Sequence, residues 1–228
     1  MGKTPVYRHV ASCKQSLTID HLKSMVGGHT LAVDASMWMH QIFGNQENGG
    51  LVYQYVVLGN CQLAVDAYMV KATTARDFGF HITHVFDGDS NPYKREEEES
   101  RAKKSLDAMK VIDPLKARHA PEEDYPILAL MAAARRTSQF QQQLKYALQD
   151  QGFTVVQALQ EADHQLAYCA QEDGSVWGVI QDDVDALVGA PHLATSYTMQ
   201  LWVQCAGVGV SKGSCGVQVL AKGGCIGG

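Results

Sequence analysis

The stretch that decides the fold runs Glu161-Ala162-Asp163-His164-Gln165-Leu166-Ala167-Tyr168, then Val176-Trp177-Gly178-Val179-Ile180, then Gln181-Asp182-Asp183-Val184-Asp185. Carboxylates bracket one short apolar segment that has the length of a buried strand. Moving a charge out of water costs several kcal/mol unless it is paired, so acids at the rim of a core need a cation. A divalent metal with oxygen ligands would serve. Helix N-termini, which favour negative charge, are the alternative, and both explanations stay open for this stretch alone.

The same pattern of a short apolar run closed by an acid occurs earlier in the chain, ending at Asp34 and at Asp87. We expect strands at residues 29–34, 82–87, 152–156 and 176–180, and a fifth at 198–203. We expect helices at residues 19–25, 35–43, 51–78, 93–110 and 127–151 and from Glu161 onward, with a loop at 44–50 and a loop or a frayed helix at 114–126. Alternating strands and helices predict an α/β domain whose mostly parallel sheet is covered by helices on both faces.

The predicted strands place acids at one edge of this sheet. Parallel sheets bind ligands beyond the carboxyl ends of their strands. The acids that follow strand candidates are Asp34, Asp87, Glu161 with Asp163, and Asp183 with Asp185. Four strand ends would therefore deliver carboxylates to one place, which favours a metal-binding acidic cluster over helix capping alone.

Composition excludes several classes of protein. No apolar run approaches the roughly 18 residues of a membrane span, and Met1-Gly2-Lys3-Thr4-Pro5 lacks the apolar core of a signal peptide. The six cysteines include no Cys-x-x-Cys pair, which argues against a zinc site or a disulfide scaffold and for a reducing compartment. The net charge of −5 does not favour nucleic-acid binding by the whole chain, but ten of the nineteen Lys and Arg residues fall between Lys94 and Arg136.

The charged helix after Asp87 has two interpretations. Lys94 and Arg101 are seven residues apart, so they share a helix face and could both point at a phosphate. Alternatively, the helix is solvated and its charges pair four residues apart, Glu97 with Arg101 and Glu99 with Lys103. The glycine-rich segment after Ala206 is neither a dinucleotide-binding fingerprint nor a phosphate-binding Walker loop.

Four motifs occur in the order of a known family: Leu31–His40, Val85–Gly88, Glu161–Tyr168 and Asp182–Asp185. Together they resemble the XPG/flap-endonuclease superfamily of structure-specific 5′ nucleases, over roughly Gly27 to Gln204. The third motif is most similar to the exonuclease-1 branch, and the Asp-Ala-Ser of the first is most similar to flap endonucleases.

The resemblance implies a PIN-like 5′-nuclease fold and a site for two Mg²⁺ ions, for which Mn²⁺ can substitute. Its metal ligands would be Asp34, Asp87, Glu161, Asp163, Asp183 and Asp185. Lys94 and Arg101 match the basic pair that steadies the scissile phosphate. His40 matches a ring that contacts the strand end, although an ordinary helix histidine is the alternative, and Gly2 belongs to the family's opening motif and would contact substrate.

The resemblance also implies an organisation and partners. Residues 1–110 and 111–204 would form one nuclease domain, with a helical arch at about 93–136. Residues 205–228 would be a glycine-rich tail, in which Gly207–Lys212 is similar to the turn of a duplex-binding helix–two-turn–helix. The expected partners are DNA with a 5′ end, flap or nick and a replication or repair protein, in the nucleus and away from membranes.

The sequence departs from the family in two places. Only Met1-Gly2 of the opening Met-Gly-Ile-x-Gly-Leu is present, and no Ser-Asp-Tyr acid follows the last expected strand. We therefore expect a C-terminally truncated or divergent member. A non-catalytic member that binds DNA or a protein partner, and an unrelated acidic metal site such as that of a phosphatase, remain alternatives.

Overall fold

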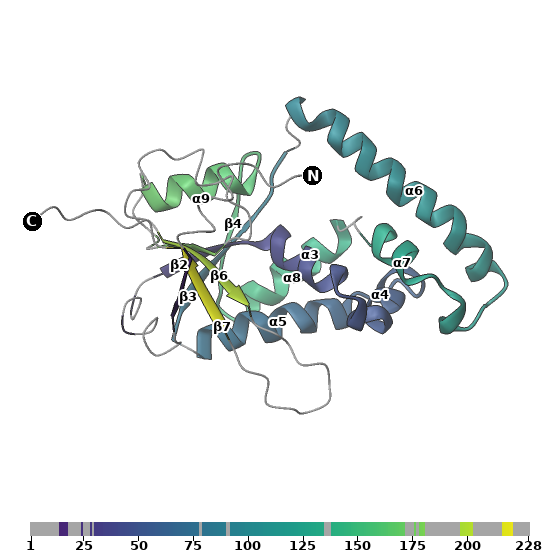
Figure 1. Ribbon diagram of the computed structural model, residues 1–228, viewed down its shortest axis with the longest axis horizontal. Coiled ribbons are helices and arrows are strands. Elements are labelled where there is room, and N and C mark those ends of the chain that lie inside the picture. Colours follow the sequence, from purple (N-terminus) through teal and green to yellow (C-terminus); the bar gives the residue numbers. More distant parts are fainter. Residues whose placement is uncertain are drawn as a thin grey trace, which may run out of the picture.

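The computed structural model (Figure 1) describes residues 14–17, 24, 28, 30–77, 79–89, 92–134, 138–171, 176, 178–180, 197–202 and 216–220. Its strands are β1 Lys14–Leu17, β2 Thr30–Asp34, β3 His81–Phe86, β4 Thr154–Gln157, β5 Gly178–Ile180, β6 Tyr197–Trp202 and β7 Gly216–Leu220. Its α-helices are α3 Ala35–Gly44, α4 Gly49–Val56, α5 Gln62–Asp77, α6 Arg95–Ala117, α7 Ile127–Ala133, α8 Ser138–Asp150 and α9 Ala162–Gln171. Short 3₁₀ turns η1 Gln46–Asn48, η2 Pro92–Lys94 and η3 Glu122–Asp124 precede α4, α6 and α7.

The strands form one sheet in the order β1-β7-β6-β5-β2-β3-β4. Strands β4, β3, β2, β5 and β6 run parallel, whereas β7 is antiparallel to both β6 and β1. The predicted α/β fold with a mostly parallel sheet is thereby confirmed, and all five strand candidates are strands. Strands β1 and β7 were not foreseen.

Helices cover the two faces of the sheet unequally. Side chains alternate along a strand, so Leu31 and Val33 of β2 enter one core and Ala32 enters the other. The larger core lies under α3, α5 and α8, and the smaller one under α9, on the opposite side of the sheet (Figure 1). Helix α6 packs against α7 and extends away from the sheet as an arm (Figure 1).

Two of the expected helices are each divided in the structure. The helix expected at 51–78 is two helices, α4 and α5, and residues 44–50 are not a plain loop, because η1 and the start of α4 lie there. Gly59 has φ +69° between the two helices, a conformation that L residues avoid. The Asn60 side chain then accepts from the backbone N–H of Gln62 at 3.0 Å and begins α5. The helix expected at 127–151 is likewise two helices, α7 and α8.

The helix of the arm is longer than expected. Helix α6 continues to Ala117 and contains Pro114, in a segment for which a loop or a frayed helix was predicted. Of the helix expected at 19–25, only Ser24 lies within the described residues, where it is helical. In the described part of the chain, no helix is both long and apolar enough to cross a membrane.

Candidate functional site

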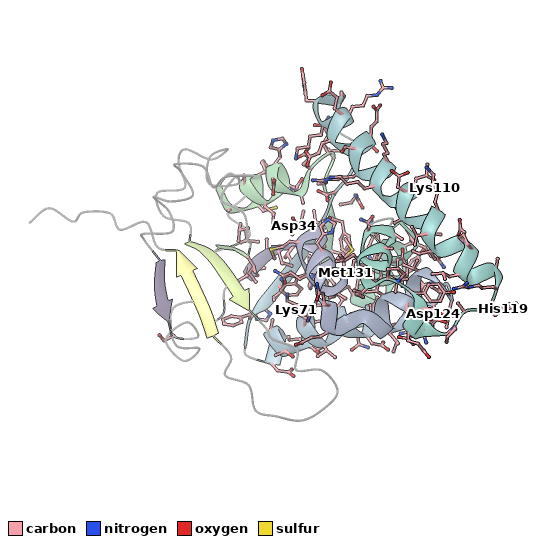
Figure 2. All side chains as sticks on the ribbon, turned by 45° about the vertical axis from the view of Figure 1, so that its right-hand side comes forward. Asp34, Lys71, Lys110, His119, Asp124 and Met131 are labelled. Carbon is pink, nitrogen blue, oxygen red and sulfur yellow. The ribbon has the colours of Figure 1, made fainter. Side chains whose placement is uncertain are left out.

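Asp34 ends β2 and also begins α3. Its side chain accepts a hydrogen bond from the backbone N–H of Ser36 at 2.8 Å, which caps the helix. Burial raises the pKa of Asp34 to about 7, and the neighbouring charges of Asp87 and Asp163 add to the rise. The backbone amides of Met37 and Ser36 act in the opposite direction but do not offset it. Figure 2 shows Asp34 where the sheet meets the helices, away from the tip of the α6 arm at His119.

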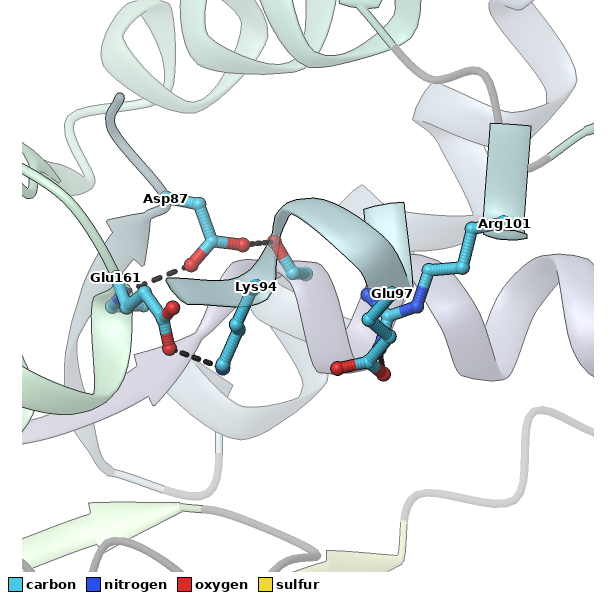
Figure 3. Close-up of polar contacts among 7 residues, drawn as sticks. Asp87, Lys94, Glu97, Arg101 and Glu161 are labelled. Atoms are coloured by element: carbon cyan, nitrogen blue, oxygen red, sulfur yellow. Dashed lines mark hydrogen bonds and ion pairs between the residues drawn. The ribbon is translucent and has the colours of Figure 1, made fainter. Parts of the chain in front are cut away.

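Asp87 follows β3, the strand beside β2, and is held at both carboxylate oxygens. One oxygen accepts from the Ser36 hydroxyl, and the other accepts from the backbone N–H of Ala162 at 2.9 Å (Figure 3). Ser36 therefore joins the acids of two adjacent strand ends, and Asp87 caps the N-terminus of α9. Helix capping, the alternative left open for the acids of residues 161–185, thus occurs here at Asp87.

Glu161 and Asp163 lie at the start of α9, beside Asp87. The carboxylate of Glu161 forms an ion pair with the ammonium of Lys94, which belongs to η2 (Figure 3). The Glu161 side chain is 17% exposed and that of Lys94 is 48% exposed, so the acid is fixed and the lysine reaches in from solvent. The hydrogen bond to Glu161, helped by the charges of Glu161 and Asp163, raises the pKa of Lys94.

Backbone contacts hold the Asp87 loop against the segment before α9. The Ala158 N–H donates to the Phe86 carbonyl at 2.9 Å, and the Asp89 N–H donates to the Leu159 carbonyl at 3.0 Å. Between them, the Gly88 N–H donates to the Gln160 carbonyl. A Cβ at Gly88 would lie 2.0 Å from the Ala158 carbonyl oxygen, so only glycine fits this close approach.

Among the other expected site residues, Arg101 makes its described contact away from the acids. Arg101 pairs with Glu97 at 2.6 Å on the exposed surface of α6 (Figure 3), one of the two pairs proposed for a solvated helix. The second proposed pair is absent from the described contacts, because Glu99 pairs with Arg95 at 2.9 Å. His40 is an exposed residue of α3. The remaining three, Gly2, Asp183 and Asp185, lie outside the described residues.

The described acids suit a divalent cation chemically, but their present contacts keep them apart. Within the part of the chain that is described, no three Asp, Glu, His or Cys side chains surround a common position for a metal. Asp34 and Asp87 cap helices, and Glu161 holds Lys94. Oxygen donors are the ligands that Mg²⁺ prefers. Burial, and then the charges of Asp87 and Asp163, raise the pKa of Asp34, and a bound cation would favour its ionised form. The donor set therefore fits a divalent cation by its chemistry, while Lys94 occupies one of the acids, Glu161.

Three polar residues beside the acids were not foreseen as site residues. They are Ser36, Gln157 and Lys145. Ser36 stands two residues after Asp34, in the first turn of a predicted helix, and that position beside the N-cap acid could have indicated it. Gln157 and Lys145 gain their contacts from the pairing of Phe86 with Gln157 in β3 and β4, which local sequence does not encode.

The chain matches two family models, the XPG N-terminal domain over residues 6–108 and the XPG I-region over residues 152–207. It is 26% identical over 187 residues to flap endonuclease 1 of Cryptosporidium muris, covering 80% of this chain and 38% of that protein. It is 31% identical over 174 residues to flap endonuclease 1 of Leishmania braziliensis, covering 73% of this chain and 42% of that protein. The chain thus spans about two-fifths of the length of these relatives.

Solved structures share the fold. The catalytic core of Rad2 superposes with a TM-score of 0.54 at 17% identity, covering 97% of this chain and 51% of that one. Human GEN1, solved in complex with Holliday junction DNA, superposes with a TM-score of 0.56 at 12% identity, covering 96% of this chain and 44% of that one.

Proposed function

Because this chain belongs to the XPG/flap-endonuclease superfamily, we propose that it is a metal-dependent nuclease that hydrolyses DNA at 5′ ends, flaps or junctions. One observation carries the proposal: Asp34, Asp87, Glu161 and Asp163 lie near one another at the carboxyl edge of the parallel sheet, and Lys94 pairs with Glu161 there. In two-metal phosphodiester cleavage, carboxylates hold the metal ions. A positively charged side chain such as Lys94 can pair with the phosphate.

The proposed site would hold two Mg²⁺ ions, with Mn²⁺ able to replace them, because carboxylate oxygens suit both. When bound, the ions would activate a water and stabilise the leaving oxygen. Asp34, Asp87, Glu161 and Asp163, together with Asp183 and Asp185, would hold them. Lys94 would leave Glu161 and pair with the scissile phosphate. Arg101 would leave Glu97 and pair with the same phosphate. His40 and Gly2 would contact the end of the strand.

We further propose that residues 1–110 and 111–204 form one nuclease domain. The α6 arm, together with α7, would correspond to the expected arch at about 93–136. It would guide a single strand toward the acids. Residues 205–228 would be the glycine-rich tail, although Gly216–Leu220 within it form strand β7 and pair with β6 and β1 of the sheet. The chain would act in DNA replication or repair in the nucleus, with a protein partner from that machinery.

A second candidate function is a non-catalytic member that binds DNA or a protein through the same fold. The observation that favours it is the engagement of the described acids with helix N-termini and Lys94, with no three of them around a common position. In that case the acids would serve mainly to cap helices.

The deciding experiment compares the wild type with Asp87→Asn on a 5′-flap duplex in Mg²⁺ or Mn²⁺. We expect the variant to cleave at least about 100-fold more slowly, since metal ions contribute several kcal/mol to transition-state stabilisation. Asp150→Asn, which removes an exposed charge at the end of α8, is the matched control and should retain full activity. Equal residual cleavage by wild type and Asp87→Asn, together with unchanged DNA binding, would support the non-catalytic alternative.

A further inference from the structure

The peptide group between Asp87 and Gly88 is held from both sides by the chain segment that leads into α9. Its N–H donates to the Gln160 carbonyl, and its carbonyl oxygen accepts from the side-chain amide of Gln157. Gln157 ends β4, directly opposite Phe86 in β3. The backbone of Asp87 is therefore clamped independently of the contacts that its carboxylate makes.

Lys145 of α8 completes this arrangement. Its ammonium donates to the side-chain carbonyl oxygen of Gln157 and lies 4.9 Å from the ring centroid of Phe86. A glutamine amide has one accepting and one donating end. Because a cation occupies the accepting end, the NH₂ group must point toward the carbonyl of Asp87. The partly buried lysine thus fixes which way the amide faces.

We propose that Gln157 is a positioning residue for Asp87, with its amide oriented by Lys145. The inference rests on the proposed function in that Asp87 is taken to be a ligand of the metal. Neither residue touches the acids' carboxylates in the described contacts, so their role is to set where the Asp87 backbone lies. Partners of this kind commonly contribute about 10-fold to metal affinity or activity, because small displacements of a ligand weaken binding.

The Gln157→Glu variant separates positioning from folding. Glutamate keeps an acceptor for Lys145 and forms an ion pair with it, so stability is retained, but it cannot donate to the Asp87 carbonyl. We expect hydrogen exchange at the Gly88 amide, followed by NMR, to accelerate about 10-fold while exchange in the sheet is unchanged. We expect Mn²⁺ affinity and kcat on a 5′-flap duplex each to fall about 10-fold, with KM for DNA changed less than about twofold.

Two further variants complete the test. Gln46→Glu adds the same charge at an exposed position of η1 and should match the wild type in all three measurements. Lys145→Met keeps an apolar stem over Phe86 and removes the donor, so it should produce a smaller change, about two- to threefold, in the same direction.

Wild-type Gly88 exchange and wild-type Mn²⁺ affinity in Gln157→Glu would overturn the proposal and leave Gln157 as an ordinary edge-strand residue. The exchange measurement needs neither metal nor DNA. If the wild type neither binds Mn²⁺ nor cleaves DNA, the proposed function fails, and Gly88 exchange alone still decides whether Gln157 positions Asp87.

Discussion

At the scale of single residues, the most informative side chain is Asp34, whose ionisation works against folding. Its pKa is about 7 in the folded chain, compared with the ordinary value of 3.8 for an aspartate carboxyl, so folding disfavours the charged form. Below pH 3.8 the carboxyl is neutral in both states, and stability is not reduced. As pH rises from about 4 to 7 the unfolded chain loses its proton first, and stability falls over that window.

Asp34→Asn should therefore stabilise the metal-free protein at pH 8 by an amount on the order of a few kcal/mol, and by almost nothing at pH 3. Asparagine still accepts a hydrogen bond from the Ser36 N–H, so the cap on α3 is retained. Urea unfolding with a chelator present, at both pH values, measures the difference. An Asn variant that is less stable than the wild type at pH 8 would contradict the explanation.

His84 has the opposite pH dependence. It is fully buried in β3, its Nδ1 lies 3.0 Å from the Tyr68 hydroxyl, and burial lowers its pKa to about 3 from 6.5. Above pH 6.5 the ring is neutral in both states, and stability is complete. As pH falls from 6.5 toward 3, only the unfolded chain takes up the proton, and stability is lost.

We expect this single group to remove about 2 kcal/mol of stability between pH 6.5 and 5. The double variant Tyr68→Phe/His84→Leu removes both partners together, so neither is left buried without its hydrogen bond. Over that interval its unfolding free energy should change by about 2 kcal/mol less than that of the wild type. If the unfolding free energies of the two proteins change equally with pH, groups other than His84 cause the loss of stability.

At the scale of elements, the hydrophobic patterns were sufficient for strands but not for the limits of helices. Short apolar runs predicted β2 to β6, since a buried parallel strand needs apolar side chains on both faces, and the runs of β2 and β3 closed on an acid. The apolar pattern of residues 51–78 predicted one helix because it continues across Gly59. In the structure, the positive φ of Gly59 marks the turn between α4 and α5. The segment from Pro114 was expected to be a loop or a frayed helix, and α6 accommodates the proline near its C-terminal end.

Gly59→Ala should lower stability by about 1 kcal/mol, because alanine is strained at φ +69° although nothing lies within 4 Å of its Cβ. Gly44→Ala is the matched control, since Gly44 is also unobstructed but has no positive φ, and it should be neutral or slightly stabilising. Thermal unfolding of the two variants separates backbone strain from packing. Equal melting temperatures would show that the turn between α4 and α5 tolerates a side chain.

At the scale of the whole molecule, topology decides which parts of the site were predictable. Parallel order brings the ends of β2 and β3 together, so the proximity of Asp34 and Asp87 follows once both are strands. Lys94 follows from the short connection between Asp87 and α6. The contacts of Ser36, Gln157 and Lys145 depend on register between segments as far as 70 residues apart, which no local pattern contains. The strand β7 depends in the same way on its partners β6 and β1.

The ion pair between Lys94 and Glu161 has a consequence for any measurement of metal affinity. The lysine is the counterion of Glu161 in this structure, so binding of the proposed metal would exchange one cation for another. The apparent dissociation constant then includes the free energy of expelling the tethered ammonium, and the expelled ammonium becomes available to an incoming anion.

Lys94→Met should therefore bind Mn²⁺ several-fold more tightly than the wild type while cleaving DNA more slowly. Arg95→Met, which removes the neighbouring charge but leaves the Glu161 pair intact, should change neither property by more than about twofold. Calorimetric titration with Mn²⁺ distinguishes the two variants. Weaker Mn²⁺ binding by Lys94→Met would mean that the ammonium positions Glu161 for the metal instead of competing with the metal for it. Tighter binding would mean that Lys94 has two roles. It neutralises Glu161 while the site holds no metal, and it pairs with the phosphate once metal is bound.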